Sequence, residues 1–380
     1  MHPIRHESRR RPPLPQAPAG CYECRPAPEC ASASLSRFFQ YTFGVQLSQL
    51  GEFGLIARLR DLIGAPAAPA VTNGPALLAG IGDDCAVSQY GALTQFATTD
   101  TMVQGVHFDV VYAGWHDIGW KALAVNLSDI AAMGGVPDYA LITLGLSADT
   151  EVEAIDDLYG GLLACAAEFP CALAGGDIVS APAFFVTVAL IGHAVSSVPY
   201  PNNALLRSAA RPGDAVAVTG TVGLSAAGLA LLKSGGEWQP AITAHLRPIP
   251  RLATGRLALE AGVRCGMDVS DGLAGDLAKL CGASGVAAEV DLNRVPVHAE
   301  LPSRFPDAWA RLALTGGEDY ELLLVAPPEV LDAVAERSAV PVTTLGRIVA
   351  GAPGHVTVWD AQGKAIDIGG GWDHLAPSPR

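Results

Sequence analysis

The 380-residue sequence is short of positive charge. Lys and Arg total 24 against 38 Asp and Glu, which leaves a formal net charge of −14. Binding to nucleic acid depends on Lys and Arg that neutralise phosphates, so this balance argues against a nucleic-acid partner. No stretch approaches the roughly 20 consecutive apolar residues of a membrane span, so we expect no membrane partner either. Half of the residues are hydrophobic, which is typical of a soluble α/β protein long enough for two domains.

Cysteine is also scarce, with 8 residues. Cys21 and Cys24 form a CxxC pair, with Cys30 nearby, but no second pair or His cluster completes four metal ligands. The other five lie among apolar residues and are typical of buried thiols in a reducing cytosol: Cys85, Cys165, Cys171, Cys265 and Cys281. No compact apolar segment of a targeting peptide precedes Phe38. We therefore expect a cytoplasmic protein.

The common nucleotide-binding motifs are missing as well. The sequence has no Gly-x-x-x-x-Gly-Lys-Ser/Thr phosphate loop, no Gly-x-Gly-x-x-Gly that opens a helix after a strand, and no kinase-type His-Arg-Asp segment. A protein of this kind that used ATP would hold the phosphates through metal ions and backbone amides.

The chain divides into three parts. Residues 1–48 contain an Arg run and many prolines without a hydrophobic period, so we expect a disordered N-terminal extension. Strands and helices then alternate, and a Ser/Pro/Asn stretch at 196–203 interrupts them. We predict two α/β domains, at 49–200 and 204–380. The expected helices include 117–133, 152–168 and 273–281, and the expected strands include 93–99, 139–146, 184–193 and 215–219.

Five short aspartate motifs are spread over nearly two hundred residues. They are Gly82-Asp83-Asp84, Thr98-Thr99-Asp100, Asn126-Leu127-Ser128-Asp129, Gly175-Gly176-Asp177 and Met267-Asp268-Val269-Ser270-Asp271-Gly272. Few basic residues lie near them in the sequence. A fold that gathers these carboxylates needs a compensating cation, since like charges repel. Oxygen ligands suit Mg²⁺, and Mg²⁺ held by a few carboxylates usually serves phosphate chemistry.

Single motifs carry different weight. Thr98-Thr99-Asp100 is expected to close a strand, at the edge where open α/β sheets bind ligands, although a helix cap is an equal alternative. Asp129 stands in an apolar helix with Asn126 one turn earlier, which favours a function. Ser270 or Asp271 is expected to cap the next helix, which is compatible with metal binding.

Taken together and in order, these motifs resemble the thiamine-monophosphate kinase family. The resemblance covers about residues 50–375. The matching stretches begin at Gly51-Glu52-Phe53-Gly54, Gly80-Ile-Gly-Asp-Asp84, Thr98-Thr-Asp-Thr, Lys121-Ala-Leu-Ala-Val-Asn126, Met267-Asp-Val-Ser-Asp-Gly272, Leu314-Thr-Gly-Gly-Glu-Asp-Tyr-Glu321 and Gly371-Trp-Asp-His374. The resemblance implies a two-domain α/β (α+β) fold like that of aminoimidazole ribonucleotide synthetase, with an N-terminal domain whose β-sheet forms a barrel in a homodimer.

The resemblance also implies an activity: transfer of the γ-phosphate of ATP to thiamine monophosphate, which gives thiamine diphosphate and ADP. Several Mg²⁺ ions would be bound by Asp84, Thr98, Thr99, Asp100, Asp129, Asp177, Asp268 and Asp271. ATP would be contacted by Tyr159, Gly176, Asp177, Arg207 and Ser270. Thiamine monophosphate would be contacted by His107, Glu318 and Trp372. The acceptor phosphate is already ionised, so no general base is expected and catalysis rests on alignment and charge neutralisation.

Two other interpretations stay open at this point. One is a sister ATP-dependent enzyme, selenophosphate synthetase-like or aminoimidazole ribonucleotide synthetase-like. The former would need a reactive Cys in a Gly-rich N-terminal loop, whereas Cys21, Cys24 and Cys30 lie among Pro and Glu. The other is a non-catalytic scaffold that binds Mg²⁺ and ATP, against which the intact aspartate set argues.

Overall fold

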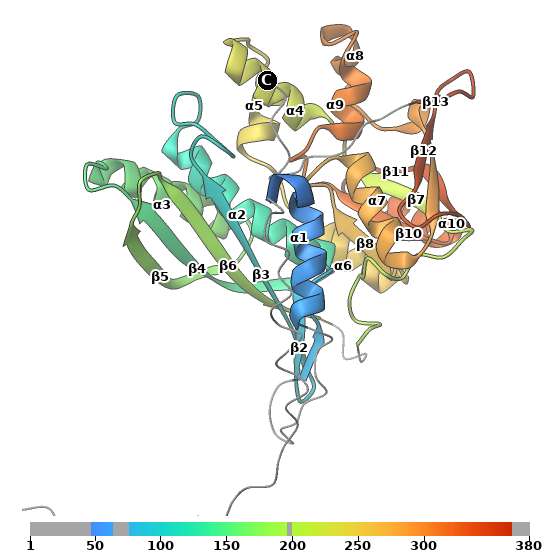
Figure 1. Ribbon diagram of the computed structural model, residues 1–380, viewed down its shortest axis with the longest axis horizontal. Helices are drawn as coiled ribbons and strands as arrows, with labels where there is room; N and C mark the ends of the chain where they lie inside the picture. Colours follow the sequence, from blue (N-terminus) through green and yellow to red (C-terminus); the bar gives the residue numbers. More distant parts are fainter. Residues whose placement is uncertain (1–46, 64–75, 196–199, 367–380) are drawn as a thin grey trace, which may run out of the picture. The chain divides into compact units, whose positions relative to one another are not determined.

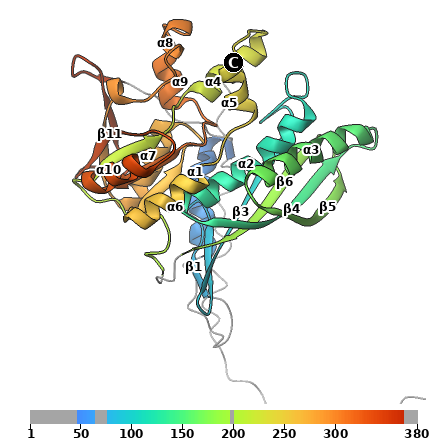
Figure 2. The ribbon, with the colours of Figure 1, turned by 180° about the vertical axis from the view of Figure 1, so that it is seen from behind.

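The computed structural model describes residues 47–63, 76–195 and 200–366. These residues belong to one compact unit that begins at Leu47. The predictions for residues 1–46, including three cysteines, and for Trp372 lie outside the described residues. Two β-sheets with their helices form the described chain and confirm the predicted two-part α/β fold (Figures 1 and 2).

The first half of the chain forms a six-stranded sheet. Its strands are β1 (Ala76–Ala79), β2 (Ala86–Tyr90), β3 (Leu93–Val103), β4 (Val136–Leu146), β5 (Ala172–Ser180) and β6 (Phe185–His193), in the order β1-β2-β3-β6-β4-β5. Neighbours are antiparallel except β4 and β5, which helix α3 (Val152–Glu168) connects. Helix α1 (Leu47–Ile63) precedes this sheet and has no buried residue.

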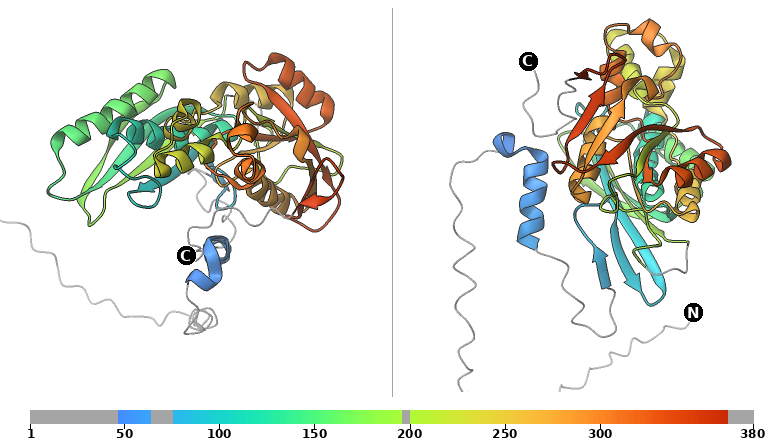
Figure 3. Two further views of the ribbon diagram at one scale, coloured as in Figure 1. Left: turned by 90° about the horizontal axis from the view of Figure 1, so that it is seen from above. Right: turned by 90° about the vertical axis from the view of Figure 1, so that its right-hand side faces the viewer.

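The second half forms a seven-stranded sheet in the order β13-β12-β9-β11-β7-β10-β8, seen from two further sides in Figure 3. The strands are β7 (Ala215–Thr219), β8 (Cys265–Asp268), β9 (Ala287–Asp291), β10 (Leu322–Ala326), β11 (Val342–Val349), β12 (Val356–Trp359) and β13 (Ala365–Ile366). The helices are α4 (Leu224–Ser234), α5 (Gln239–Leu246), α6 (Leu252–Ala261), α7 (Leu273–Ser284), α8 (Leu301–Arg304), α9 (Trp309–Thr315) and α10 (Pro328–Arg337), with a 3₁₀ turn at Leu292–Arg294.

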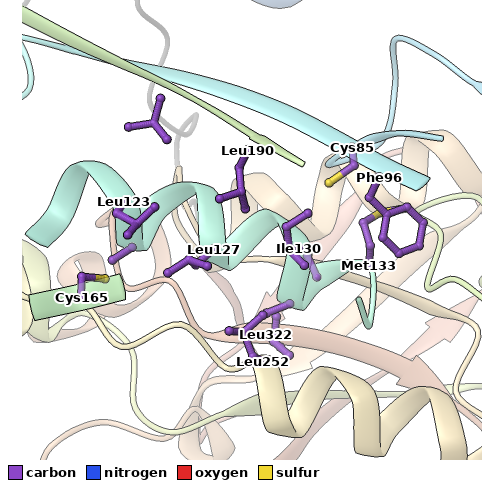
Figure 4. Packing of buried hydrophobic residues seen from close by; sticks show 14 of the residues in the cluster. Cys85, Phe96, Leu123, Leu127, Ile130, Met133, Cys165, Leu190, Leu252 and Leu322 are labelled. Carbon is purple, nitrogen blue, oxygen red and sulfur yellow. The ribbon is translucent and has the colours of Figure 1, made fainter. Parts of the chain in front are cut away.

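Helix α2 (Trp115–Ala132) joins the two halves. Fourteen of its residues are buried, because it contacts strands β3 and β6 of the first sheet and β8 and β10 of the second. In Figure 4 Leu123, Leu127 and Ile130 of α2 lie near Leu190 of β6 on one side and near Leu252 and Leu322 on the other. Apolar side chains all round are typical of a helix buried on every face. Polar side chains on such a helix are held in fixed positions, which is why α2 supplies site residues.

Helices α2 and α3 approach each other closely at two glycines. A Cβ atom on Gly119 would lie 1.9 Å from the carbonyl oxygen of Leu158, and one on Gly161 would lie 1.8 Å from that of His116. Any larger residue at either position forces the two backbones apart. The pair therefore fixes α2 beside α3.

Most predicted elements are present with small shifts at their ends, but two predictions are wrong. Strand β3 continues to Val103, so residues 98–100 lie inside the strand and do not close it. Its pairing with β6 runs unbroken from Gln95 to Val103, and Met102 beyond Asp100 is buried again. Cys171 is half-buried, whereas the other four described cysteines are buried. No described helix is long and apolar enough to cross a membrane.

Candidate active site

Three aspartates from separate elements converge at the junction of the two halves. Asp84 precedes β2, Asp129 lies in the last turn of α2 and Asp268 ends β8. One carboxylate oxygen of each lies within 4.8 Å of the others. We call this group the three-aspartate centre. Oδ2 of Asp84 is buried and has no hydrogen-bond partner among the described residues. Three oxygen ligands and an unpaired buried oxygen are the donor set that a hard divalent cation such as Mg²⁺ prefers.

The electrostatics of the three-aspartate centre agree with a cation. Burial raises the pKa of Asp129 well above its usual range, and the charges of Asp100, Asp268 and Asp84 raise it further. Burial and the charge of Asp84 likewise raise the pKa of Asp268. A carboxylate that resists ionisation becomes an effective ligand once a cation compensates its charge. The residues present therefore fit a magnesium site.

Neighbouring side chains fix the directions of these carboxylates. Thr98 donates a hydrogen bond to Oδ2 of Asp129. Ser128, the residue before Asp129 in α2, donates to Oδ2 of Asp268 over 2.6 Å. Oδ1 of Asn126 accepts from the backbone N–H of Asp100 over 3.0 Å and so ties α2 to β3. Asn126 and Asp129 thus act on the same side of α2, as their spacing predicts.

A basic side chain also reaches the three-aspartate centre. The guanidinium of Arg207 pairs with Oδ1 of Asp84, and the backbone N–H of Arg207 donates to Asp83 over 3.3 Å. Arg207 lies more than a hundred residues from Asp84 in the sequence. The expectation that these carboxylates have almost no basic neighbour is therefore wrong for the folded protein. Burial and the charge of Asp84 raise the pKa of Asp83 to about 7.

Ser270 and Asp271 lie in the loop that follows β8, and Asp276 of α7 holds this loop. Oδ2 of Asp276 accepts from the backbone N–H of both Ser270 and Asp271 over 2.9 Å. Lys279 bridges Asp276, at 2.7 Å, and Asp271. The expected cap by Ser270 or Asp271 is therefore wrong: the N-cap residue of α7 is Gly272, without a side-chain cap. Asp276 and Lys279 were missed: an Asp in the first turn suits the positive end of a helix, but that signal does not identify a contact with the preceding loop.

A second cluster surrounds Glu318. Its Oε1 lies 2.9 Å from Nζ of Lys121 in α2, and its Oε2 lies 3.4 Å from Nδ1 of His245 in α5. Burial raises the pKa of Glu318, but the charge and contact of Lys121 together with His245 and His107 lower it by more in sum, so the net shift is downward. His107 therefore lies close enough to act on Glu318, and its Nδ1 accepts from the backbone N–H of Val103 over 3.0 Å. The structure thus brings together two of the three predicted substrate-binding residues.

The loop of residues 316–320 holds Glu318 in an uncommon backbone conformation. Glu318 has φ 66° and Tyr320 has φ 50°, values that non-glycine residues rarely adopt. The carboxylate of Asp319 between them accepts from Gly223 N–H over 2.6 Å and from Ser225 N–H over 3.1 Å at the start of α4. Strained backbone that several contacts hold in place is typical of functional sites.

The predicted residues on α3 and β5 lie apart from the three-aspartate centre. Asp177 is aligned with Thr143 of β4, Thr187 of β6 and Thr101 of β3. Adjacent strands are about 4.8 Å apart, so Asp177 lies roughly 14 Å from β3. Gly176 lies next to it, and its missing Cβ leaves room for the carbonyl oxygen of Ile142.

Two further predicted residues are Tyr159 and Thr99. Tyr159 of α3 packs against the apolar core, and Thr99 lies inside β3 opposite Ala189.

Comparison with known proteins decides the family. Residues 82–194 match "AIR synthase related protein, N-terminal domain", and residues 211–358 match the corresponding C-terminal domain. The thiamine-monophosphate kinase of Bacillus subtilis is 40% identical over 71% of this chain and 85% of its own length. That of Salmonella typhimurium is 38% identical over 86% of this chain and 98% of its own.

This chain belongs to the thiamine-monophosphate kinase family.

Solved structures agree with membership of the thiamine-monophosphate kinase family. AaThiL complexed with AMPPCP and TMP matches with a TM-score of 0.74 and 32% identity, over 88% of this chain and all of that one. The hydrogenase maturation protein HypE in complex with ATP matches with a TM-score of 0.61 and 18% identity over 85% of this chain. The second likeness concerns the fold alone.

Proposed function

We propose that this chain transfers the γ-phosphate of ATP to thiamine monophosphate, which gives thiamine diphosphate and ADP. Its membership of the thiamine-monophosphate kinase family supports the reaction, and the related AaThiL binds an ATP analogue together with TMP. The observation that carries the proposal in this chain is the convergence of Asp84, Asp129 and Asp268, together with the Glu318 cluster. The three-aspartate centre suits metal-bound phosphates, and the Glu318 cluster suits a polar organic acceptor.

The chemistry needs alignment more than acid–base catalysis. The acceptor is a phosphate oxygen that is already ionised at neutral pH, so the protein does not have to remove a proton. The three-aspartate centre would hold Mg²⁺, which neutralises charge on the transferring phosphate. Ser128 and Thr98 keep two of its carboxylates in fixed directions. We infer direct in-line transfer without a phosphorylated enzyme.

The remaining site assignments form part of the same proposal. Beyond the three-aspartate centre, the further Mg²⁺ ligands would be Thr98, Thr99, Asp100, Asp177 and Asp271. The ATP contacts would be Tyr159, Gly176, Asp177, Arg207 and Ser270, and the acceptor contacts His107, Glu318 and Trp372. Since Asp177 lies three strands from β3, ATP would extend along the first sheet between the two groups.

We further propose a cytoplasmic homodimer of chains with two domains, at 49–200 and 204–380. Strand β5 supports the dimer, because it is the last strand of its sheet and is exposed along most of its length, with Ile178 70% exposed. Open sheet edges with apolar side chains are natural places for pairing with another chain. The five described cysteines are all free thiols, in agreement with a reducing compartment.

The test is product formation from ATP, Mg²⁺ and thiamine monophosphate, with thiamine diphosphate quantified by thiochrome fluorescence after chromatography. Asp268→Asn removes one carboxylate of the three-aspartate centre, and Asp156→Asn on the exposed side of α3 is the matched control. Product from the parent and from Asp156→Asn, with a loss of at least about 100-fold in Asp268→Asn, supports the proposal. No product from the parent protein refutes it.

A further inference from the structure

Lys121 is an unusual residue for the middle of a buried helix. It is 3% exposed, and the α2 residues on either side of it, Trp120 and Ala122, are also buried. Removing an ammonium group from water is costly unless charges and hydrogen bonds compensate. Lys121 has one oppositely charged neighbour at ion-pair distance among the described residues, Glu318 at 2.9 Å.

This contact leaves most of the donor capacity of Lys121 unused. An ammonium group carries three N–H donors. Nζ lies 2.9 Å from Oε1 of Glu318 and has no other hydrogen-bond partner among the described residues. The ion pair alone explains the charge balance. It does not explain why a group with three donors is placed there.

Glu318 shows the complementary pattern. Its carboxylate has Lys121 on one oxygen and Nδ1 of His245 on the other. Burial lowers the pKa of His245 to about 3, so this ring is neutral, and Nδ1 also lies 3.1 Å from Oγ of Ser225. The Glu318 side chain is 26% exposed, so it is only half-buried. A half-buried acceptor thus lies directly beside a buried donor.

We propose that Lys121 is a substrate-binding residue, which together with Glu318 recognises the aminopyrimidine ring of thiamine monophosphate. This inference rests on the proposed function. The ring presents an exocyclic amino group, a donor, next to a ring nitrogen, an acceptor. Glu318 accepts from the amino group, and Lys121 donates to the ring nitrogen. The strained backbone at Glu318 and the rigid position of Lys121 on α2 hold the two groups in this arrangement.

The test compares two acceptors on each protein: thiamine monophosphate, and an analogue in which C–H replaces the ring nitrogen next to the amino group. The proteins are the parent, Lys121→Met, and Lys364→Met as a control on an exposed turn. The readout is the ratio of kcat/KM for the two acceptors. If Lys121 has a merely structural role, Lys121→Met lowers kcat/KM for both acceptors by the same factor. The ratio then stays unchanged, because both values depend equally on the fraction of protein that is folded.

We expect the parent and Lys364→Met to prefer thiamine monophosphate by about 10- to 100-fold, the range for a hydrogen bond to a charged group. In Lys121→Met the ratio should fall to about 1, since the group that reads the nitrogen is gone. A Lys121→Met ratio equal to that of the parent overturns the inference.

A ratio near 1 for the parent protein also overturns the inference about Lys121. This result can be obtained even if Lys121→Met does not fold. If the parent makes no product from either acceptor, the proposed function fails. Calorimetric binding of the two acceptors to the parent then decides the role of Lys121 by the same ratio of affinities.

Discussion

Replacing Asp129 by Asn should stabilise the metal-free protein. The three carboxylates lie within 4.8 Å of one another. Two full charges at that distance repel by about 3.5 kcal/mol at an effective dielectric constant of 20. The folded protein avoids part of this repulsion because burial and the neighbouring carboxylates raise the pKa of Asp129 and so favour its protonated form. In the unfolded chain Asp129 ionises with a pKa of about 3.9, and this difference destabilises the fold by about 1.4 kcal/mol per pH unit.

The sign of the effect follows from the raised pKa. The contribution of Asp129 to stability is fully present below about pH 3.9 and is lost as the pH rises toward its folded-state pKa. An Asn side chain is always neutral and can still accept the hydrogen bond from Thr98. We therefore expect Asp129→Asn to raise the free energy of unfolding, with a larger gain at pH 7 than at pH 5.

Urea unfolding in EDTA at both pH values, with Asp156→Asn as the matched control, measures this gain. Saturating Mg²⁺ should reduce this advantage of Asp129→Asn, because only the parent has all three carboxylates to bind the ion. The parent gains about 2.7 kcal/mol at a hundredfold excess of Mg²⁺ over its Kd, and Asp129→Asn gains much less. An Asp129→Asn protein that is less stable than the parent in EDTA, or equally stabilised by Mg²⁺, would contradict the assignment of a cation to this centre.

Three further predictions concern the supports of the site. Glu321, which follows the loop of residues 316–320, forms an ion pair with Arg251. Replacing Glu321 by Leu leaves Arg251 as an unpaired, half-buried charge, so urea unfolding should show that the free energy of unfolding falls by about 3–5 kcal/mol. An unchanged free energy of unfolding would mean that this ion pair does not stabilise the loop. Burial raises the pKa of Asp319 to about 8, so metal-free protein should lose stability as the pH rises from about 4 to 8, and Asp319→Asn should flatten that slope. Gly161→Ala places a Cβ atom 1.8 Å from a backbone oxygen of α2, so its melting temperature should fall by several degrees, whereas Gly160→Ala should change little.

The sequence predicted the parts of the site that lie in recognisable local contexts. Asp129 stood out because an acidic residue in an apolar helix needs a reason, and it does belong to the three-aspartate centre. Helix α3 was predicted with its observed bounds, because its apolar residues recur at helical spacing. Strand β3 was predicted too short, because Thr98-Thr-Asp100 reads as the end of a strand until its pairing with β6 is known.

Contacts between distant residues could not be predicted in this way. Arg207 pairs with Asp84 across 123 positions, and Ser128 donates to Asp268 across 140. Asp276 supports the loop before α7, and an unaligned sequence does not distinguish it from any other first-turn acid. Lys121 was part of a recognised motif, but its ion pair with Glu318 follows from the packing of α2 between the two halves.

The most direct test of the account is a single-turnover experiment with γ-³²P-labelled ATP, Mg²⁺ and thiamine monophosphate. Direct transfer predicts that the label moves to the terminal phosphate of thiamine diphosphate, with one ADP formed for each product and no label on the protein. Asp268→Asn should lose this transfer, and Asp156→Asn should retain it. Label on the protein, or release of labelled phosphate without labelled thiamine diphosphate, would contradict direct transfer at the three-aspartate centre.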